Sequence, residues 1–161
     1  MPLAGVHVAV SGGGDAGDEV CALAEEVGRE LARRGAVVVT GGLGGVMAAA
    51  SRGAKAEGGT TIGILPGDDR AAANEWVDVA VPTGMGEGRN VLLVRAVDAV
   101  IAVAGEFGTL SEIALALRLG KPVVGLGTWD IDAVVRASTP AEAAERAVTL
   151  ATPPPAPPTG S

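Results

Sequence analysis

The chain alternates short runs of β-branched residues with longer stretches in which apolar residues recur every three or four positions. The clearest helical stretch is 18–34, which places Val27 and Leu31 on one face and glutamates and arginines on the other. The run 99–103 reads Ala-Val-Ile-Ala-Val and is typical of a strand buried on both faces. This alternation predicts βαβ units and a parallel sheet.

The whole pattern predicts a single α/β domain with a Rossmann-like, doubly wound parallel sheet over residues 1–151. The predicted strands are 5–10, 36–40, 60–65, 76–81, 99–103 and 122–126. The predicted helices are 18–34, an alanine-rich helix after the loop 41–45 that ends near 57, one opened by 84–90 that runs to 96, 109–119 and 140–150. Residues 152–161 contain five prolines and are predicted to form an extended, disordered tail.

Composition and charge narrow the class of protein. The formal net charge is −7, no basic run is longer than Arg33-Arg34, and the chain has only three aromatic residues, so a nucleic-acid partner is not expected. The single cysteine, Cys21, excludes an internal disulfide and fits a reducing compartment. Without a leader pattern or an apolar stretch long enough to span a bilayer, we expect a cytoplasmic protein with no membrane partner.

Four glycine-rich segments follow predicted strands and precede helices, namely 11–17, 41–45, 84–90 and 105–109. In a parallel sheet these positions share one edge, where ligands bind. Glycine lets backbone amides approach an anion closely, and a helix N-terminus favours negative charge. Each glycine could instead only form a tight turn, but four such segments favour a cradle for a phosphate or pyrophosphate.

Several familiar chemistries are disfavoured. Gly12, Gly14 and Gly17 match the G-x-G-x-x-G dinucleotide pattern, but the second strand ends without the carboxylate that would hold the ribose of NAD. His7 is the only histidine and is predicted to be structural, so neither a zinc site nor a Ser-His-Asp triad is expected. We therefore predict no metal site.

Three polar residues remain as candidates for chemistry. Glu112 follows the last glycine-rich segment by one helical turn, and Arg89 with Asn90 opens the helix after the fourth strand. Two simpler explanations stay open: Glu112 could close a capping box with Thr109, and Arg89 could be a solvated surface residue.

The sequence resembles the LOG (Lonely Guy), or lysine decarboxylase-like, family, and most of all its branch of molybdenum cofactor carrier proteins. The residues that carry the resemblance extend from the first strand to Trp129. They include Gly-Gly-Leu-Gly-Gly-Val-Met at 41–47, Gly-Gly-Thr-Thr-Ile-Gly-Ile-Leu-Pro-Gly at 58–67, Pro-Thr-Gly-Met-Gly-Glu-Gly-Arg-Asn at 82–90 and Gly-Glu-Phe-Gly-Thr-Leu-Ser-Glu at 105–112.

The resemblance implies a Rossmann-like homodimer or higher homo-oligomer that handles a phosphorylated small molecule. Members of the family hydrolyse the N-glycosidic bond of nucleoside 5′-monophosphates and carry the signature P-G-G-x-G-T-x-x-E. By position, Gly108 and Thr109 would help to hold phosphate, Glu112 would be the catalytic carboxylate and Arg89 its cationic partner. A carboxylate could stabilise the oxocarbenium-like state of that cleavage.

The sequence departs from this signature at two places, and both bear on whether the protein is a carrier or a hydrolase. Ala104-Gly105-Glu106 stands in place of P-G-G, and Asn90 stands where the family has a lysine. Both changes make the loop less favourable for a dianion and agree with the carrier branch.

The first hypothesis is therefore a protein that binds a phosphorylated nucleotide or the pterin-type molybdenum cofactor, with no cofactor needed for catalysis. The second is a nucleoside 5′-monophosphate phosphoribohydrolase that uses Glu112 and Arg89. The candidate ligand-binding residues are Ser11, Gly12, Gly13, Gly41, Gly42, Gly45, Arg89, Asn90, Gly105, Glu106, Gly108 and Thr109.

Overall fold

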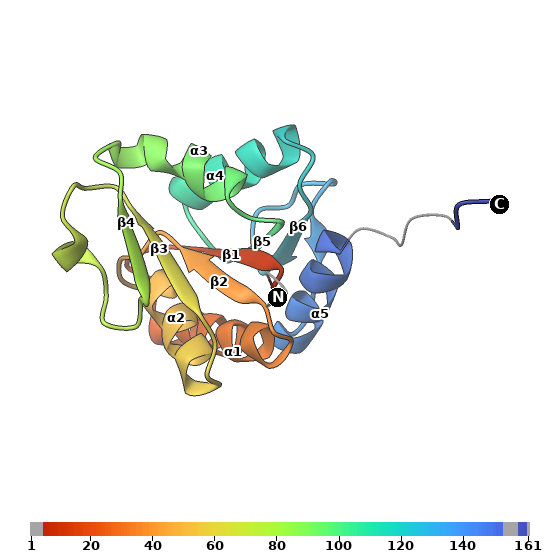
Figure 1. Cartoon of the computed structure of the whole chain (residues 1–161), viewed down its shortest axis with the longest axis horizontal. Coiled ribbons are helices and arrows are strands. Elements are labelled where there is room, and N and C mark those ends of the chain that lie inside the picture. The colour runs from red at the N-terminus through yellow and green to blue at the C-terminus, as the bar shows by residue number, and fades with distance from the viewer. Residues whose placement is uncertain (1–4, 153–157, 161) are drawn as a thin grey trace.

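The computed structural model describes residues 5–152 and 158–160, and it shows a parallel sheet between two layers of helices (Figure 1). The strands are β1 (His7–Ser11), β2 (Val37–Thr40), β3 (Thr61–Leu65), β4 (Val79–Pro82), β5 (Ala99–Val103), β6 (Val123–Leu126) and β7 (Val135–Arg136). The helices are α1 (Asp18–Arg33), α2 (Val46–Ala56), α3 (Arg89–Arg95), α4 (Phe107–Arg118) and α5 (Pro140–Ala151), with short 3₁₀ helices at Arg70–Ala72 and Gly86–Gly88. The predicted single-domain, Rossmann-like fold class is confirmed.

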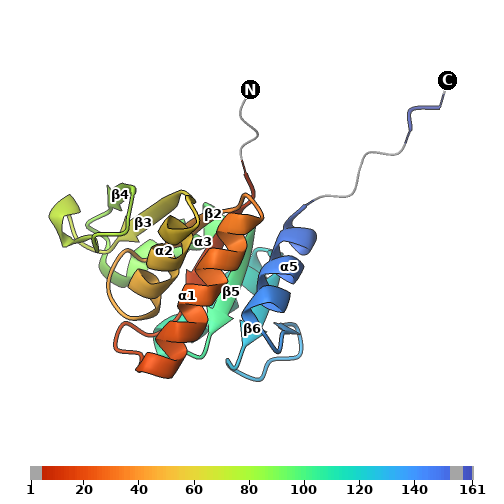
Figure 2. The same cartoon turned by 90° about the horizontal axis from the view of Figure 1, so that it is seen from below.

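The sheet is doubly wound, because its strand order is β4-β3-β2-β1-β5-β6-β7 and every pair is parallel. The order reverses between β1 and β5, where Ser11 pairs with Ala102. Helices α1, α2 and α5 cover one face, and α3 and α4 cover the other (Figures 1 and 2). A crevice is expected at such a reversal, beyond the carboxyl ends of the strands.

Two apolar cores hold the layers together. One lies between the sheet and α1, α2 and α5, and it includes Val8, Leu31 and Ile101. The other lies beneath α3 and α4 and includes Leu93 and Ile113. All five residues of β5 are buried, as the apolar run 99–103 predicts, because helices cover both of its faces.

Helices α1 and α2 pack so closely that their contact requires glycine. A β-carbon on Gly28 would lie 2.0 Å from Ala50 O, and one on Gly53 would lie 1.9 Å from Glu25 O. Because each glycine lacks a side chain, the backbone of the other helix can come into direct contact with it, and the alanine-rich α2 packs tightly against α1.

The differences from the sequence-based prediction concern edges and ends. The fourth strand is Val79–Pro82 rather than 76–81, and α4 begins at Phe107, two residues before its predicted start at 109. The two-residue strand β7 was not predicted, because it pairs with β6 alone through one short stretch. His7 begins β1, and its Nδ1 lies 2.8 Å from Gly5 O, a local structural contact. The proline-rich tail falls largely on residues 153–157 and 161, which lie outside the described residues.

None of the helices in the described part of the chain is both long and apolar enough to cross a membrane.

Candidate functional site

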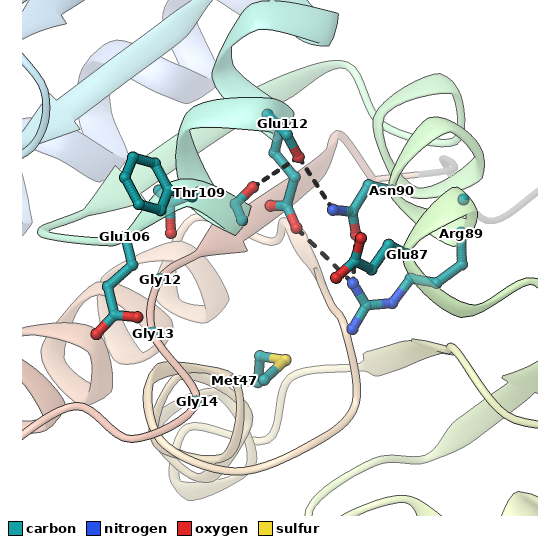
Figure 3. Close-up of a pocket in the computed structure, with 14 residues that line it drawn as sticks. Gly12, Gly13, Gly14, Met47, Glu87, Arg89, Asn90, Glu106, Thr109 and Glu112 are labelled. Carbon is teal, nitrogen blue, oxygen red and sulfur yellow. Dashed lines mark hydrogen bonds and ion pairs between the residues drawn. The ribbon is translucent and has the colours of Figure 1, made fainter.

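A pocket of about 610 Å³ opens where the strand order reverses, beyond the ends of β1 and β5 (Figure 3). This volume lies within the range of about 300–1,000 Å³ that is usual for small-molecule sites. Three of the four glycine-rich segments contribute to it. The lining residues are Gly12, Gly13, Gly14, Met47, Glu87, Gly88, Arg89, Asn90, Glu106, Phe107, Gly108, Thr109, Ser111 and Glu112.

One wall of the pocket is backbone. The first intrahelical hydrogen bond of α4 runs from Leu110 N to Glu106 O, so the amides of 107–109 have no partner within the helix. A β-carbon on Gly108 would meet nothing within 4 Å, and one on Gly13 would meet only Ala16 N at 3.9 Å. Helix start and loop therefore leave open space beside their amides, which can accept an anionic group.

The segment 41–45 supports this wall from behind and does not line the pocket. Val46 N donates to Gly13 O at 3.1 Å, and a β-carbon on Gly45, whose φ is +60°, would lie 2.3 Å from the same oxygen. Gly41 and Gly42 are buried, and a β-carbon on Gly41 would lie 2.5 Å from Arg89 Nη2. These three candidate residues are therefore needed for close packing of the loops.

Ser11 and Gly105 also lie outside the lining. Ser11 is buried at the end of β1, and no hydrogen-bond partner of its Oγ is found among the described residues. Gly105 has a φ of +109°, and a β-carbon there would lie 2.5 Å from the Thr109 side chain. Ala104 before it also has a positive φ, of 48°, so the turn from β5 into α4 is held in an unusual conformation.

Arg89 is half-buried, and its guanidinium is largely used within the protein. Its Nε donates to Ile64 O at 2.9 Å, its Nη1 donates to Asn90 Oδ1, and its Nη2 reaches Gly41 O at 3.5 Å. Burial lowers the pKa of Arg89, while the charge of Glu112 acts in the opposite direction. Arg89 is thus not a surface residue in solvent, and it is aligned by backbone carbonyls and by Asn90, whose Nδ2 donates to Ser111 Oγ at 3.2 Å.

Glu112 is buried at the base of the pocket and points toward Arg89 (Figure 3). Its Oε1 lies 4.0 Å from Arg89 Nη1, while its Oε2 has no hydrogen-bond partner within the described residues. Burial raises the pKa of Glu112, and the Ser11 hydroxyl and the Arg89 charge oppose that shift. Since Ser11 Oγ also lacks a partner of good geometry, the two groups approach each other without forming a regular hydrogen bond.

The capping-box explanation for Glu112 does not hold. Helix α4 has its N-cap at Glu106, which makes no side-chain cap, and Thr109 is already the third helical residue. Glu112 is instead the sixth residue of α4, and it lines the pocket.

The pocket carries more negative than positive charge. The carboxylates of Glu87, Glu106 and Glu112 line it, and Arg89 is the one basic side chain among the described lining residues. Glu87 and Glu106 are exposed, so water screens them, whereas Glu112 is not screened in this way. In Figure 3, Glu106 extends away from the pair formed by Arg89 and Glu112.

The structure brings together eight of the candidate site residues in this pocket: Gly12, Gly13, Arg89, Asn90, Glu106, Gly108, Thr109 and Glu112. It adds six lining residues that were not among the candidate site residues: Gly14, Met47, Glu87, Gly88, Phe107 and Ser111. Four of these six lie inside glycine-rich segments and could have been included on that ground. Met47 and Ser111 lie in the first turn of α2 and the second turn of α4, and the signal that could have found them is their place in the motifs 41–47 and 105–112. No group of three or more potential metal ligands occurs in the described ranges.

The chain is similar to two solved structures over more than nine-tenths of its length, and to a further protein in sequence over three quarters of it. The molybdenum cofactor binding protein from the phototrophic bacterium Rippkaea orientalis superposes with a TM-score of 0.87 at 37% identity, over 93% of this chain and 99% of that one. The molybdenum cofactor carrier protein of Chlamydomonas reinhardtii superposes with a TM-score of 0.80 at 34% identity, over 91% and 98% of the two chains. An uncharacterized protein of Archaeoglobus fulgidus is 43% identical over 121 residues, which cover 75% of this chain and 80% of the relative.

The family assignment follows from a match to most of the chain. The model of the SLOG cluster4 family matches residues 5–155, a range that contains every helix and strand described above and all residues of the pocket. The chain belongs to the SLOG cluster4 family.

Proposed function

We propose that this protein is a carrier that binds a phosphorylated pterin-type or nucleotide-type cofactor, such as the molybdenum cofactor, in the pocket beyond β1 and β5. The observation that carries the proposal is the pocket itself, which is lined both by glycines that leave space beside their backbone amides and by the buried polar side chains of Asn90, Thr109 and Glu112. The similarity to a molybdenum cofactor binding protein and a molybdenum cofactor carrier protein supports the choice of ligand class.

The residues fit the two chemical parts of such a ligand. The amides of 13–14 and 107–109 would donate hydrogen bonds to the phosphate, since Gly13 and Gly108 have no side chains to take up the space it needs. The carboxyl group of Glu112, a residue that lines the pocket, would accept hydrogen bonds from ring N–H groups or from an amino group of the ligand. A pterin supplies its amino and ring N–H donors there, and this residue would orient it.

The charge of the pocket favours transport over permanent retention. Three carboxylates and one arginine line the pocket, and each nitrogen of that arginine already donates one hydrogen bond within the protein, so the affinity for a phosphate rests mainly on neutral amides. A site of this kind binds a dianion less strongly than a cluster of cations would, and it releases the ligand more readily.

Binding is tested by titrating the purified protein with molybdenum cofactor released from a molybdoenzyme, and with GMP, AMP and ribose 5-phosphate. We expect the melting temperature to rise with the concentration of the ligand that binds. We also expect the released cofactor to remain with the protein through gel filtration. A melting temperature unchanged by every compound at millimolar concentration would contradict the proposal.

A second candidate function is the hydrolysis of nucleoside 5′-monophosphates, of the kind known in the LOG family. The buried Glu112, 4.0 Å from Arg89, is the observation that favours it, because a carboxylate in this position could stabilise an oxocarbenium-like state. Arginine cannot act as an acid at neutral pH, so Arg89 would bind phosphate or the leaving base. Release of free base from AMP or related monophosphates, abolished by Glu112→Gln, would support this function and exclude a carrier without turnover.

We further propose that the protein works in the cytoplasm as a homodimer or higher homo-oligomer, without a nucleic-acid partner. The resemblance to the LOG family supports the oligomer, and the net charge of −7 supports the absence of nucleic acid. Light scattering of the purified protein measures the first, and retention on heparin at low salt would contradict the second.

A further inference from the structure

We infer that Phe107, backed by Trp129, is the surface on which a planar heteroaromatic ring of the ligand stacks at the mouth of the pocket. The inference rests on the proposed function and specifies which part of the ligand this end of the pocket recognises. The ligand class is a fused bicyclic heterocycle, a pterin or a purine, that carries a phosphate.

Phe107 is an unusual residue to leave in water. It lines the pocket and is 79% exposed, more than any other large hydrophobic side chain in the described part of the chain. An aromatic side chain has a large area to bury, and this one buries little of it within its own chain. Its position beside the pocket means that a bound ligand can cover it.

Trp129 holds this ring in place. The two ring centroids lie 6.0 Å apart with an interplanar angle of 30°, and Trp129 Nε1 donates to Glu106 O at 3.2 Å. Trp129 follows β6, and Phe107 begins α4, so the pair joins two segments that are distant in sequence. The hydrogen bond ends on the residue directly before Phe107, and it therefore also fixes the start of α4.

The distribution of aromatic residues strengthens the argument. The entire sequence contains one phenylalanine, two tryptophans and no tyrosine. Two of these three side chains are at this one place, whereas Trp76 precedes β4 at the opposite end of the sheet. The core is built from aliphatic residues, so the aromatic pair is not needed for packing.

The surroundings fit a ring with hydrogen-bond donors. Phe107 is flanked in the lining by Glu106, and Glu112 lies deeper in the same pocket. A π-face together with the Glu112 carboxyl group as an acceptor matches a heterocycle that has amino and ring N–H groups, and it does not match a sugar phosphate without an aromatic ring. Base stacking on an aromatic side chain also tolerates either a pterin or a purine, because both have extended π-faces.

The test compares a ligand that has the ring with one that lacks it. Affinities for GMP and for ribose 5-phosphate are measured by calorimetry on the wild type, Phe107→Leu and Phe107→Tyr. Leucine keeps an apolar side chain but removes the π-face, whereas tyrosine keeps the ring. We expect Phe107→Leu to weaken GMP binding about tenfold, within the usual range for loss of base stacking, with ribose 5-phosphate unchanged and Phe107→Tyr close to the wild type.

A second readout uses the intrinsic fluorescence of Trp129. In a Trp76→Phe background, Trp129 is the sole tryptophan, and GMP should change its emission while ribose 5-phosphate should not. Lack of any change with saturating GMP would contradict stacking on the pair.

The outcomes separate this inference from the proposed function. If the wild type binds neither compound, nor cofactor released from a molybdoenzyme, both are overturned. If it binds GMP and Phe107→Leu binds GMP equally well, only the stacking inference is overturned. If Phe107→Leu loses affinity because an oligomer dissociates, as gel filtration would reveal, Phe107 belongs to a subunit contact and the inference is again wrong.

Discussion

Glu112 and Arg89 lie side by side in the pocket, yet their closest atoms, Oε1 and Nη1, are 4.0 Å apart. The guanidinium donates instead to Ile64 O and to Asn90 Oδ1. The carboxylate is therefore buried near a cation without a hydrogen bond from it, which makes its ionised form costly in the folded protein.

Glu112→Gln is expected to stabilise the protein at neutral pH. Burial raises the pKa of Glu112 in the folded protein above its value in the unfolded chain. The free energy of unfolding of the wild type therefore falls as the pH rises from the pKa of the unfolded chain through that of the folded protein. Glutamine has the same shape but cannot ionise, so it avoids the cost of a buried charge, and we expect the variant to melt about 2–4 °C or more above the wild type at pH 7.5. The difference should vanish near pH 4, below the ordinary glutamate pKa of about 4.3.

Thermal unfolding at both pH values measures this difference. Glu145→Gln, at an exposed position of α5, serves as the control and should change little at either pH. A variant that melts below the wild type at pH 7.5 would mean that the ion pair with Arg89 outweighs the burial cost.

Gly12→Ala should lower the stability of the fold, whereas Gly13→Ala should leave stability unchanged and weaken ligand binding. A β-carbon on Gly12 would lie 2.6 Å from Val46 Cγ2, so we expect Gly12→Ala to destabilise the fold by about 1–3 kcal/mol. A β-carbon on Gly13 meets nothing closer than 3.9 Å, so Gly13→Ala should fold normally. Its methyl group takes space beside the pocket, and we expect about tenfold weaker GMP binding, which corresponds to about 1.4 kcal/mol.

Urea unfolding and calorimetry on both variants give these two quantities. If a stable Gly13→Ala protein bound GMP as tightly as the wild type, the phosphate would not bind beside Gly13, and the prediction would be wrong.

Neutralising the exposed carboxylates of the pocket should strengthen the binding of phosphorylated ligands. Glu87 and Glu106 repel a dianion, but water screens them, so we expect Glu87→Gln and Glu106→Gln each to raise affinity about two- to fivefold at low salt. The gain should shrink at 0.5 M NaCl. Unchanged or lower affinity in Glu106→Gln would indicate that Glu106 contacts the ligand as a hydrogen-bond acceptor.

Gly28→Ala and Gly53→Ala should each destabilise the protein severely. Their β-carbons would lie 2.0 and 1.9 Å from backbone oxygens of the opposing helix, which cannot move without separating α1 from α2. We expect a loss of about 3 kcal/mol or more in the free energy of unfolding, measured with urea. Gly67→Ala is the matched control, because a β-carbon there meets nothing within 4 Å. An equal stability of Gly28→Ala and Gly67→Ala would contradict the close packing of the two helices.

Local pattern was sufficient for most of the fold. The prediction of β5 as 99–103 agrees with the structure at both ends, and α1 differs from its prediction by one residue. Errors arose where a local signal is weak: β7 has two residues and depends on β6 for its existence, and α4 begins inside a segment whose glycines suggested a loop. The register of such elements depends on neighbours that are remote in sequence.

For the site, residue type and position after a strand were enough to single out Arg89, Asn90, Glu106, Gly108, Thr109 and Glu112 as candidates. They were not enough to separate glycines that face the pocket from glycines that support it. Gly13 and Gly45 both follow strands in glycine-rich segments, but Gly13 lines the pocket and Gly45 packs behind it against Gly13 O. That distinction exists only when the two loops are placed against each other.

The sequence by itself determined the parallel α/β architecture and the edge of the sheet at which the glycine-rich segments gather, because periodicity and turn residues act locally and parallel strands share their carboxyl ends. Only the tertiary structure decided that Arg89 is engaged by backbone carbonyls, that Glu112 is buried with an unpartnered oxygen, and that Phe107 and Trp129 meet at the mouth of the pocket. Burial, pKa and contact between segments depend on the packing of the whole chain, and no short stretch of sequence contains that information.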